Sequence, residues 1–427
     1  MYKSNFNGPR KSGGSGFGSR NHGSGGFRGA PGGQQTFRGG RSGGFRGGRG
    51  GGGNRGKTET INFARFINKV QVIEEVEVFK PEHNFQDFKI LDLLKDSIRD
   101  KGYKLPTPIQ DKAIPQVLMG SDIVGVANTG TGKTAAFLIP VINKILLNRK
   151  EQVMIIVPTR ELAIQIDDEL KQFTRNMKIY SVCCVGGAPI FKQISQLRLQ
   201  YNFIIGTPGR IKDLIDRRMI FLDEFNTLIL DEADRMLDMG FVHDMRAIMS
   251  GMPKERQTLF FSATVSPDIE RLIKEFLKNP LRISVKTQDI SKNIEQDVVH
   301  IKCGENKTDI LCELLKNKEL AKVLIFGRTK HGVEKLSQIL VKKGFKADSI
   351  HGDKTHGKRQ QALRSFKDNY SQILVATDVA ARGLDIDNVS HVINYDIPAT
   401  NDDYVHRIGR TGRGSKKGKA ITFVEGK

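Results

Sequence analysis

The acidic cluster Asp231-Glu232-Ala233-Asp234 is the part of this sequence best suited to chemistry. It directly follows the mostly apolar run Thr227-Leu228-Ile229-Leu230, which is typical of a strand buried in a parallel sheet. In an open α/β sheet the reactive groups lie just beyond the carboxyl ends of the strands. Carboxylates at that place can hold Mg²⁺ and orient a water molecule. The alternative is a strand end followed by a solvated acidic loop, and the sequence upstream argues against it.

A glycine-rich loop lies about a hundred residues upstream of the acidic cluster. Residues 122–126 are predicted to form a strand and residues 135–147 a helix, and between them runs Ala127-Asn128-Thr129-Gly130-Thr131-Gly132-Lys133-Thr134. Glycines at a helix N-terminus let backbone N–H groups surround a phosphate. Lys133 would supply charge to the β- and γ-phosphates, and the Thr134 hydroxyl can coordinate Mg²⁺. Ala127 replaces the first glycine of the general pattern, but the flanking strand and helix support the match.

Strands and helices alternate downstream of this loop, and the alternation predicts an α/β fold with a parallel sheet covered on both faces. The further strands are predicted at Val153–Val157, Ser181–Val185, Phe203–Gly206, Leu228–Leu230 and Thr258–Phe261. Polar motifs follow the strand ends at residues 158–162, 186–187, 207–210, 231–234 and 262–264. Each alone could be a turn or a helix cap, but five at one sheet edge indicate a functional surface.

A second α/β pattern occupies the C-terminal part of the chain and has no Gly-Lys-Thr loop of its own. Its strands are predicted at Val323–Phe326, Ala347–Ile350, Ile373–Ala376, His391–Tyr395 and Ala420–Val424. Polar motifs again follow strands, at residues 351–353, 376–378, 382–385 and 406–413. Ahead of the glycine-rich loop, apolar residues at helical spacing over residues 85–102 predict a helix that faces the core; they are Phe88, Leu91, Leu94 and Ile98.

The net charge of +21 is spread unevenly along the 427 residues. Residues 1–57 hold eleven Lys or Arg and no Asp or Glu, and Phe-Arg-Gly recurs at residues 27–29, 37–39 and 45–47. Such a Gly-, Ser- and Arg-rich composition cannot offset chain entropy by burial, so we expect a disordered tail. Arg can grip phosphate and Phe can stack on bases. The tail therefore resembles the RGG-type segments of RNA-binding proteins, with a solubilising linker as the alternative.

Other compositional features exclude several protein classes. No apolar stretch is long enough to span a bilayer, and the N-terminus lacks the apolar core of a signal peptide, so we expect a soluble cytoplasmic protein. The four cysteines show no Cys-x-x-Cys spacing, which argues against a zinc site or a disulfide framework. We expect Cys183, Cys184, Cys303 and Cys312 to be buried free thiols.

Taken together, these motifs closely resemble the DEAD-box family of ATP-dependent RNA helicases. The resemblance runs from about Phe85 to Val424 in family order, and it is specific because the glycine-rich loop, Asp-Glu-Ala-Asp, Ser-Ala-Thr and His-Arg-Ile-Gly-Arg-Thr-Gly-Arg all occur. It implies two tandem RecA-like domains with parallel sheets, ATP and Mg²⁺ as cofactors, and RNA as a largely sequence-independent partner. The compact core looks bacterial.

The resemblance also assigns roles to individual residues. Those implied in catalysis are Lys133, Asp231, Glu232, His406, Arg410 and Arg413. Those implied in nucleotide binding are Phe85, Gln110, Thr129, Gly130, Thr131, Gly132, Lys133, Thr134 and Asp385, with Thr134 and Asp231 at the metal. Ser262, Thr264 and Asp234 would couple the nucleotide state to contacts between the domains. Those implied in RNA binding are Arg160, Gly187, Thr207, Arg210, Arg359 and Thr377.

Some of these roles agree with phosphoryl-transfer chemistry, which needs positioning and charge neutralisation more than covalent catalysis. Glu232 would activate the attacking water, and Gln110 would read the adenine edge with Phe85 supporting the base. Arg410 and Arg413 would be arginine fingers from the second domain, with surface salt bridges as the alternative role. Such fingers make hydrolysis conditional on domain closure.

The expected domains are a Gly/Arg-rich tail (1–57), an N-terminal extension (58–84), a first RecA-like domain (85–286), a linker (287–298) and a second RecA-like domain (299–427). Two departures from the family pattern stand out. His356 occupies a position where the family usually has Gln, and the chain ends three residues after the strand at 420–424, where the family usually continues into a helix.

Two competing functions are a DNA-directed translocase of the same superfamily and a non-catalytic RNA clamp. The RNA class is favoured by Gln110 with Phe85, and by the motif Asp-Glu-Ala-Asp rather than a variant of it that ends in His. The presence of every catalytic residue type argues against the clamp. The sequence identifies neither the physiological RNA nor any protein partner.

Overall fold

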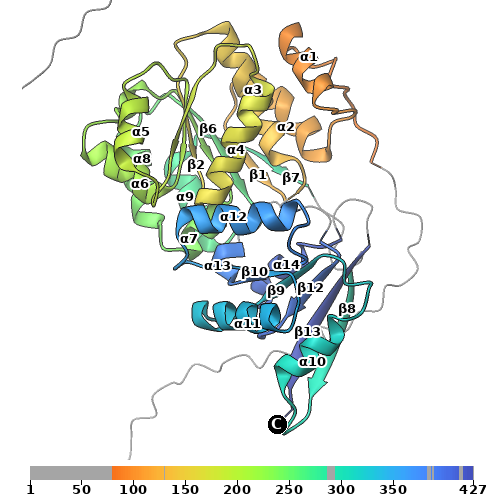
Figure 1. Cartoon of the computed structure of the whole chain (residues 1–427). Helices are drawn as coiled ribbons and strands as arrows, with labels where there is room; N and C mark the ends of the chain where they lie inside the picture. The colour runs from red at the N-terminus through yellow and green to blue at the C-terminus, as the bar shows by residue number, and fades with distance from the viewer. Residues whose placement is uncertain are drawn as a thin grey trace, which may run out of the picture. The chain divides into compact units, whose positions relative to one another are not determined.

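The computed structural model describes residues 79–128, 130–285, 294–381, 386, 389–412 and 417–426. The described part of the chain contains two α/β units, each built on its own parallel sheet (Figure 1). The predicted tail at 1–57 and most of the predicted extension at 58–84 lie outside the described residues.

The first sheet has seven strands in the order β3-β4-β2-β5-β6-β1-β7, and every neighbouring pair is parallel. Its strands are β1 (Ile123–Val126), β2 (Val153–Ile156), β3 (Ser181–Cys184), β4 (Phe203–Gly206), β5 (Thr227–Leu230), β6 (Gln257–Ser262) and β7 (Leu281–Ser284). The helices are α1 (Asp92–Asp100), α2 (Pro108–Leu118), α3 (Lys133–Leu147), α4 (Arg160–Phe173), α5 (Ile190–Leu197), α6 (Pro208–Asp216), η2 (Leu222–Glu224), α7 (Ala233–Asp238), α8 (Val242–Gly251) and α9 (Pro267–Phe276).

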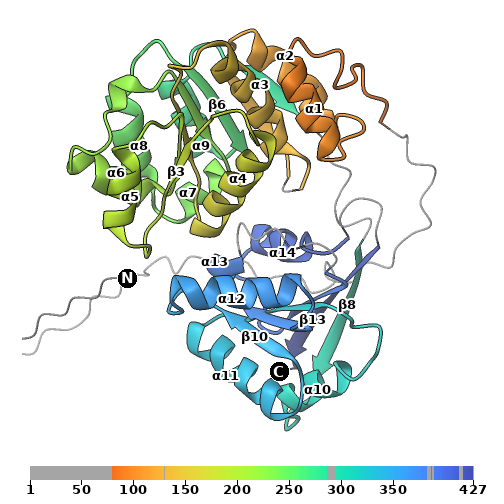
Figure 2. The same ribbon diagram turned by 45° about the horizontal axis from the view of Figure 1, so that its top comes forward.

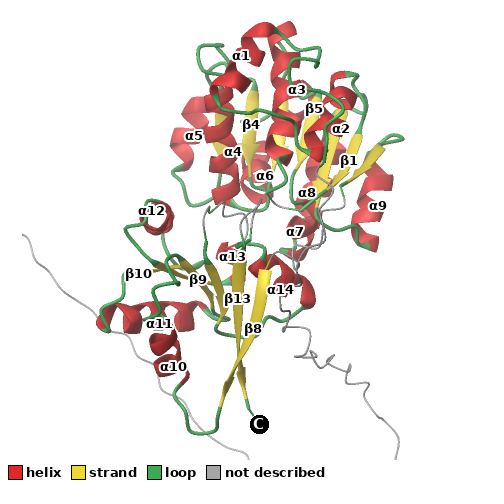
Figure 3. Cartoon of the chain, turned by 90° about the vertical axis from the view of Figure 1, so that its right-hand side faces the viewer, coloured by secondary structure: helices red, strands yellow, loops and turns green. Residues whose placement is uncertain are grey.

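Helices cover both faces of the sheet at its central strands, so β1, β2, β4 and β5 are buried at nearly every position rather than at alternate ones. Ile155 and Ile229 face the core formed with α1 to α4, whereas Met154 and Leu228 face the core formed with α6 to α9. Figures 2 and 3 show these helices as layers on the two sides of the strands. Continuous apolar strands between helical layers are the expected form of a parallel sheet.

The second sheet has six strands in the order β10-β11-β9-β12-β13-β8, and its neighbouring pairs are also parallel. Its strands are β8 (Ile294–Ile301), β9 (Val323–Phe326), β10 (Ala347–Ile350), β11 (Ile373–Ala376), β12 (His391–Asn394) and β13 (Gly418–Glu425). The helices are α10 (Lys307–Leu314), α11 (Lys330–Lys342), α12 (His356–Lys367), α13 (Asp378–Ala381) and α14 (Asn401–Ile408). Side chains of α10 and α11 line one core and those of α12 and α13 another.

The two sheets repeat one topology. Replacing β8 to β13 by β1 to β6 in chain order turns the second strand order into β3-β4-β2-β5-β6-β1, which is the first sheet without its edge strand β7. The tandem α/β domains with parallel sheets are therefore confirmed. In this correspondence the glycine-rich loop after β1 matches the segment after β8.

Three details of the predicted fold are wrong. Strand β8 begins at Ile294, inside the predicted linker 287–298; Glu295 and Asp297 are exposed while Ile294 and Gln296 are buried, so the polar residues belong to an edge strand. The predicted helix at 85–102 covers only Asp92–Asp100. Cys303 is exposed, whereas Cys184 and Cys312 are buried as predicted and Cys183 is intermediate.

None of the helices in the described part of the chain has the length and apolar character needed to cross a membrane.

Candidate active site at the carboxyl edge of the first sheet

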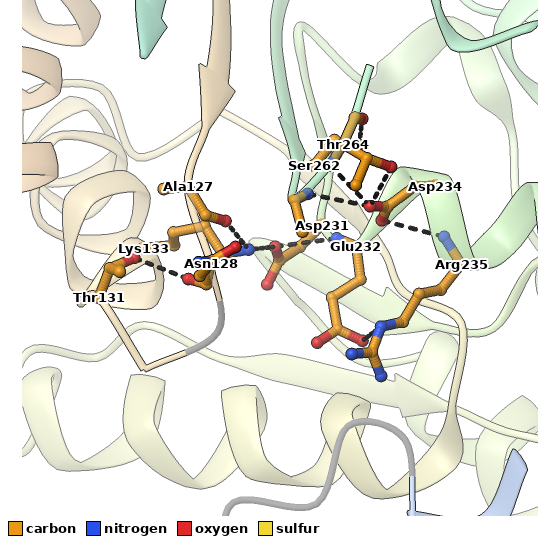
Figure 4. Close-up of polar contacts among 11 residues, drawn as sticks. Ala127, Asn128, Thr131, Lys133, Asp231, Glu232, Asp234, Arg235, Ser262 and Thr264 are labelled. Atoms are coloured by element: carbon orange, nitrogen blue, oxygen red, sulfur yellow. Dashed lines mark hydrogen bonds and ion pairs between the residues drawn. The ribbon is translucent and has the colours of Figure 1, made fainter. Parts of the chain in front are cut away.

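The strand order of the first sheet brings three polar motifs together. Strand β6 lies between β1 and β5, so the Ser-Ala-Thr segment after β6 lies between the glycine-rich loop after β1 and the acidic cluster after β5. Because all neighbouring strands are parallel, the motifs that follow β2, β3 and β4 lie at the same edge. The predicted gathering of polar motifs at one sheet edge is confirmed. Figure 4 shows the central side chains pointing toward one another.

The glycine-rich loop is held against helix α2 by Gln110. The Gln110 Nε2 donates to the Gly132 carbonyl oxygen at 3.0 Å, and the Gln110 Oε1 accepts from the Thr107 backbone N–H at 2.9 Å. Gly132 adopts φ +92°, and a Cβ there would lie only 2.5 Å from the Gln110 Nε2. The backbone conformation at 132 thus favours glycine, and an added Cβ would also displace the Gln110 side chain.

Lys133 opens helix α3 and reaches across to the acidic cluster. Its Nζ donates to the Ala127 carbonyl oxygen at 3.0 Å and lies 3.7 Å from the Asp231 Oδ1. Both side chains are buried. Burial raises the pKa of the Asp231 carboxyl to about 6, although the Lys133 ammonium pulls it down. Since a desolvated carboxyl gains from a neighbouring positive charge, Asp231 is suited to meet a further cation.

Asp234 connects the acidic cluster to the Ser-Ala-Thr segment. Its Oδ2 accepts hydrogen bonds from the Ala263 N–H at 3.1 Å, from the Thr264 N–H at 2.9 Å and from the Thr264 hydroxyl at 3.1 Å. The Ser262 hydroxyl donates to the Thr264 carbonyl oxygen at 2.7 Å. These contacts link the ends of β5 and β6 within the first domain. The role of Ser262, Thr264 and Asp234 in coupling the two domains stays a prediction.

Glu232 lies at the N-cap of helix α7 in a left-handed conformation, with φ +53° and ψ +48°. Non-glycine residues rarely adopt this conformation, and it is often found at functional sites. Its backbone N–H donates to the Asp231 Oδ1 at 2.9 Å. The Glu232 carboxylate has an ionic neighbour that sequence reasoning missed, since the Arg235 Nε lies 3.6 Å from its Oε2. The only sequence signal was the position of Arg235 one helical turn after Glu232.

Four residues predicted to bind RNA gather farther along the same edge. The Arg160 guanidinium lies against Gly187, where φ is +75° and a Cβ would be 2.2 Å from the Arg160 Nη1. The Arg210 Nη1 donates to the Gln193 Oε1 at 3.0 Å, and the Thr207 N–H donates to the Cys184 carbonyl oxygen at 3.1 Å. The structure therefore brings Arg160, Gly187, Thr207 and Arg210 to the ends of three adjacent strands, β2 to β4.

In the second domain the buried Arg407, from the motif at 406–413, is anchored to α13 and to the end of β12. The Arg407 Nε and Nη2 form a bidentate ion pair with Asp378, at 2.5 and 2.7 Å, and the Nη1 donates to the Asn394 Oδ1 and the Asp396 carbonyl oxygen. Sequence reasoning missed this structural role. The neighbouring Arg410 is 3% exposed, so its side chain would have to be reoriented to reach a nucleotide.

The roles of the remaining predicted site residues stay predictions, and the structure places these residues as follows. Phe85 is 4% exposed, and its ring packs edge-on against Phe88 and Tyr103 in the core. Gln110 is 1% exposed. Half-buried Thr134 follows Lys133 on α3. His406 lies on α14, Arg359 on α12 and buried Thr377 after β11. Thr129, Asp385 and Arg413 lie outside the described residues.

Comparisons with known proteins agree with this geometry. The family model for DEAD/DEAH box helicases matches residues 107–272, and that for the helicase conserved C-terminal domain matches residues 306–415. The ATP-dependent RNA helicase CshA of Listeria monocytogenes is 47% identical over 343 residues, which are 80% of this chain and 66% of that protein.

Two solved structures have a similar fold. The structure of Dbp5 from S. cerevisiae bound to RNA and ADP–BeF3 gives a TM-score of 0.71 at 31% identity, and the match covers 81% of this chain and 90% of the other. The structure of Mss116p bound to single-stranded RNA and AMP-PNP gives a TM-score of 0.70 at 29% identity and covers 81% and 77%.

Proposed function

The chain belongs to the DEAD-box helicase family, and on that premise we propose that it is an ATP-dependent RNA helicase. It hydrolyses ATP to ADP and phosphate when RNA is bound, and it couples hydrolysis to closure of its two domains on single-stranded RNA. The result is local duplex unwinding and remodelling of RNA–protein complexes. We expect it to act in the cytoplasm, where ATP and RNA are both present.

The observation that carries this proposal is the polar constellation around Lys133. A buried ammonium, the carboxylates of Asp231 and Glu232, and the Asp234–Thr264 contacts converge at adjacent strand ends. Phosphoryl transfer needs such positioned charge. Lys133 would bind the β- and γ-phosphates in place of the Ala127 carbonyl oxygen. Glu232 would orient the attacking water and accept its proton.

Mg²⁺ fits the donors present. Asp231 offers a carboxylate oxygen and Thr134 a hydroxyl, and Mg²⁺ prefers oxygen ligands while retaining several waters. Among the described residues no three His, Cys, Asp or Glu side chains form a metal-binding group, which agrees with a site completed by water and nucleotide phosphates. When bound, the ion would neutralise charge on the phosphates.

RNA would lie across the edge formed by Arg160, Gly187, Thr207 and Arg210. Arg and backbone N–H groups suit phosphate and sugar contacts, which carry no sequence information. Arg359 and Thr377 are the proposed contacts from the second domain. Binding would therefore be largely independent of sequence.

The second domain would supply the residues that make hydrolysis conditional. Arg410 and Arg413 are the proposed fingers for the γ-phosphate, His406 would link them to the acidic cluster, and Asp385 would meet the ribose. Adenine selection by Gln110 stays a prediction, because its amide would have to exchange its contact with Gly132 for the base edge.

An ATPase assay with and without single-stranded RNA tests the proposal. Wild-type turnover should rise with RNA. The variant Glu232→Gln should lose turnover by about 10²- to 10⁴-fold, the usual contribution of a general base, and still bind ATP and RNA. The matched control is Glu255→Gln, because Glu255 is exposed and pairs with Lys278, away from the acidic cluster.

Other outcomes identify the competing functions. Stimulation by single-stranded DNA as strong as that by RNA would indicate a DNA-directed translocase. ATP and RNA binding without any turnover by the wild type would indicate a non-catalytic clamp. Turnover by Glu232→Gln within tenfold of wild type would mean that another group activates the water.

A further inference from the structure

Arg235 is the largest fully buried side chain among the described residues, with 1% of its surface exposed. It lies in the first turn of helix α7, three residues after Glu232, and α7 packs against α9 and β6. Its neighbours on this helix, Ala233 and Met236, belong to an apolar core cluster. A guanidinium stays charged at any pH a protein tolerates, so a permanent positive charge lies in an apolar setting beside the active site.

The charged atoms of Arg235 and Glu232 are only partly satisfied. Within the described part of the chain, the buried Arg235 Nη1 and Nη2 make no hydrogen bond, and the buried Glu232 Oε2 makes none either. The nearest approach joins the Arg235 Nε to the Glu232 Oε2 at 3.6 Å, which is an ion pair but too long for a hydrogen bond. Figure 4 shows the second carboxylate oxygen of Glu232 directed away from the guanidinium.

This arrangement is a poor one for stability. Burying a charged group without full hydrogen bonding is unfavourable, and an apolar side chain of similar volume is often as good or better for the fold. Leu, Met or Ile at 235 would match the apolar cluster around α7. A buried guanidinium beside a carboxylate whose backbone adopts a left-handed conformation therefore points to a task in the site.

We propose that Arg235 is a positioning residue for Glu232, an inference that rests on the proposed function. Its charge draws the Oε2 toward the interior and so fixes the rotation of the carboxylate, which leaves the other oxygen facing the attacking water. The contact is loose, without a hydrogen bond, so the carboxylate keeps its capacity to accept a proton. Arg235 touches neither nucleotide nor water and acts only through Glu232.

The variant Arg235→Met tests this role, because Met has a similar length and no charge. The turnover number kcat at saturating ATP and RNA should fall about 10- to 100-fold, since misplacing a reacting group by about 1 Å can cost 100-fold. The KM for ATP and the affinity for RNA should stay within twofold. The midpoint of thermal unfolding should be unchanged or higher. Arg235→Lys retains the charge and should restore part of the lost kcat.

The matched control is Arg256→Met at the opposite edge of the sheet. Arg256 donates to the Thr258 hydroxyl and to the Met249 and Pro253 carbonyl oxygens, so its loss should lower the unfolding midpoint and leave kcat unchanged. This is the reverse of the pattern expected for Arg235→Met.

The outcomes separate this inference from the proposed function. A wild type without RNA-stimulated ATPase overturns the proposed function itself. If the wild type is active and Arg235→Met turns over within twofold of it, only the positioning role is overturned. The role is also overturned if Arg235→Met loses kcat together with thermal stability and ATP binding, if Arg235→Lys loses as much kcat as Arg235→Met, or if neither variant folds.

Discussion

At the scale of single residues, the contact between Gly132 and Gln110 determines the shape of the glycine-rich loop. A Cβ at position 132 would lie 2.5 Å from the Gln110 Nε2 and 2.9 Å from the Thr107 Oγ1, in a backbone with φ +92°. We predict that Gly132→Ala weakens ATP binding by at least about tenfold, equivalent to about 1.4 kcal/mol. Titration with a fluorescent ATP analogue measures this.

The control for that prediction is Gly120→Ala. Gly120 has φ +84°, and a Cβ at this position would meet no described atom within 4 Å, so this substitution imposes the backbone strain without the collision. It should lower the free energy of unfolding by about 1–2 kcal/mol, the usual cost of a left-handed conformation for a residue with a Cβ, and leave ATP affinity unchanged. Equal ATP affinity in Gly132→Ala and the wild type would mean that the loop adjusts freely.

Residues of the site could be predicted from the sequence where their motif is typical of a single kind of chemistry. Lys133 follows glycines at a helix N-terminus and Asp231 follows a buried strand, and the structure places them 3.7 Å apart. Arg235 was not predictable, because a charged residue in an acidic helix turn is usually exposed and burial depends on tertiary packing. The ring of Phe85 packs in the core against Phe88 and Tyr103, and its role beside the adenine stays a prediction.

At the scale of elements, the Glu334 carboxylate fastens helix α11 to strand β10. Its Oε2 accepts from the Ser349 hydroxyl at 2.6 Å, and it lies 3.0 Å from the His351 Nε2 and 3.3 Å from the Lys354 Nζ. The Ser349 hydrogen bond, followed by the contacts with His351 and Lys354, lowers the pKa of Glu334 to about 2 despite some desolvation. A depressed carboxyl pKa adds stability above the unfolded-state value near 4.5, and that contribution is lost as pH falls toward 2.

We therefore predict that Glu334→Gln lowers the free energy of unfolding by about 1 kcal/mol at pH 7, a value reduced for solvent screening because the side chain is partly exposed. The deficit relative to wild type should shrink by about half between pH 7 and pH 3. Urea denaturation at both pH values tests this. Glu313→Gln is the control, since Glu313 is exposed and pairs with the equally exposed Lys316. A deficit independent of pH would show that shape, not charge, matters at Glu334.

Central elements were easier to predict from sequence than edge elements. The strands at 323–326 and 373–376 were placed correctly because they are central in the sheet, buried on both faces and continuously apolar. The edge strand at 347–350 was also placed correctly, although it contains Asp348 and Ser349 and is only partly buried. Strands β7 and β8 were missed because each lies at the edge of its sheet and keeps polar side chains on the solvent side. Helix α1 is shorter than predicted, since Phe85 and Phe88 are buried from turns ahead of it.

At the scale of the whole molecule, the repeated strand order identifies the segment of the second domain that is equivalent to the glycine-rich loop of the first. The segment between β8 and α10 occupies the place of the glycine-rich loop and contains Cys303 and Gly304 but no Gly-Lys-Thr. The second domain therefore repeats the topology of the first without repeating its glycine-rich loop. The absence of a second Gly-Lys-Thr motif was visible in the sequence, but the equivalence of β8 and β1 could be recognised only from the strand order in the structure.

The last prediction concerns residues 1–57, which hold eleven positive charges, no negative ones and Phe beside Arg in three repeats. If this segment neutralises about six phosphates, log affinity for single-stranded RNA should fall with log salt by roughly 0.7 for each of them. Deleting residues 1–57 should therefore weaken RNA binding most at low salt and flatten its salt dependence. Turnover at saturating RNA should barely change, because no proposed catalytic residue lies there.

Fluorescence anisotropy of a labelled single-stranded RNA between about 50 and 200 mM salt provides the measurement. A second variant with Ser in place of Phe27, Phe37 and Phe45 separates stacking from charge, because base stacking contributes about 1–3 kcal/mol per base without changing the salt slope. Weaker binding with an unchanged slope in this variant would assign the Phe side chains to bases. If the truncated chain kept both the affinity and the slope of the wild type, residues 1–57 would not tether RNA, and the positive charge of the domains would have to account for binding.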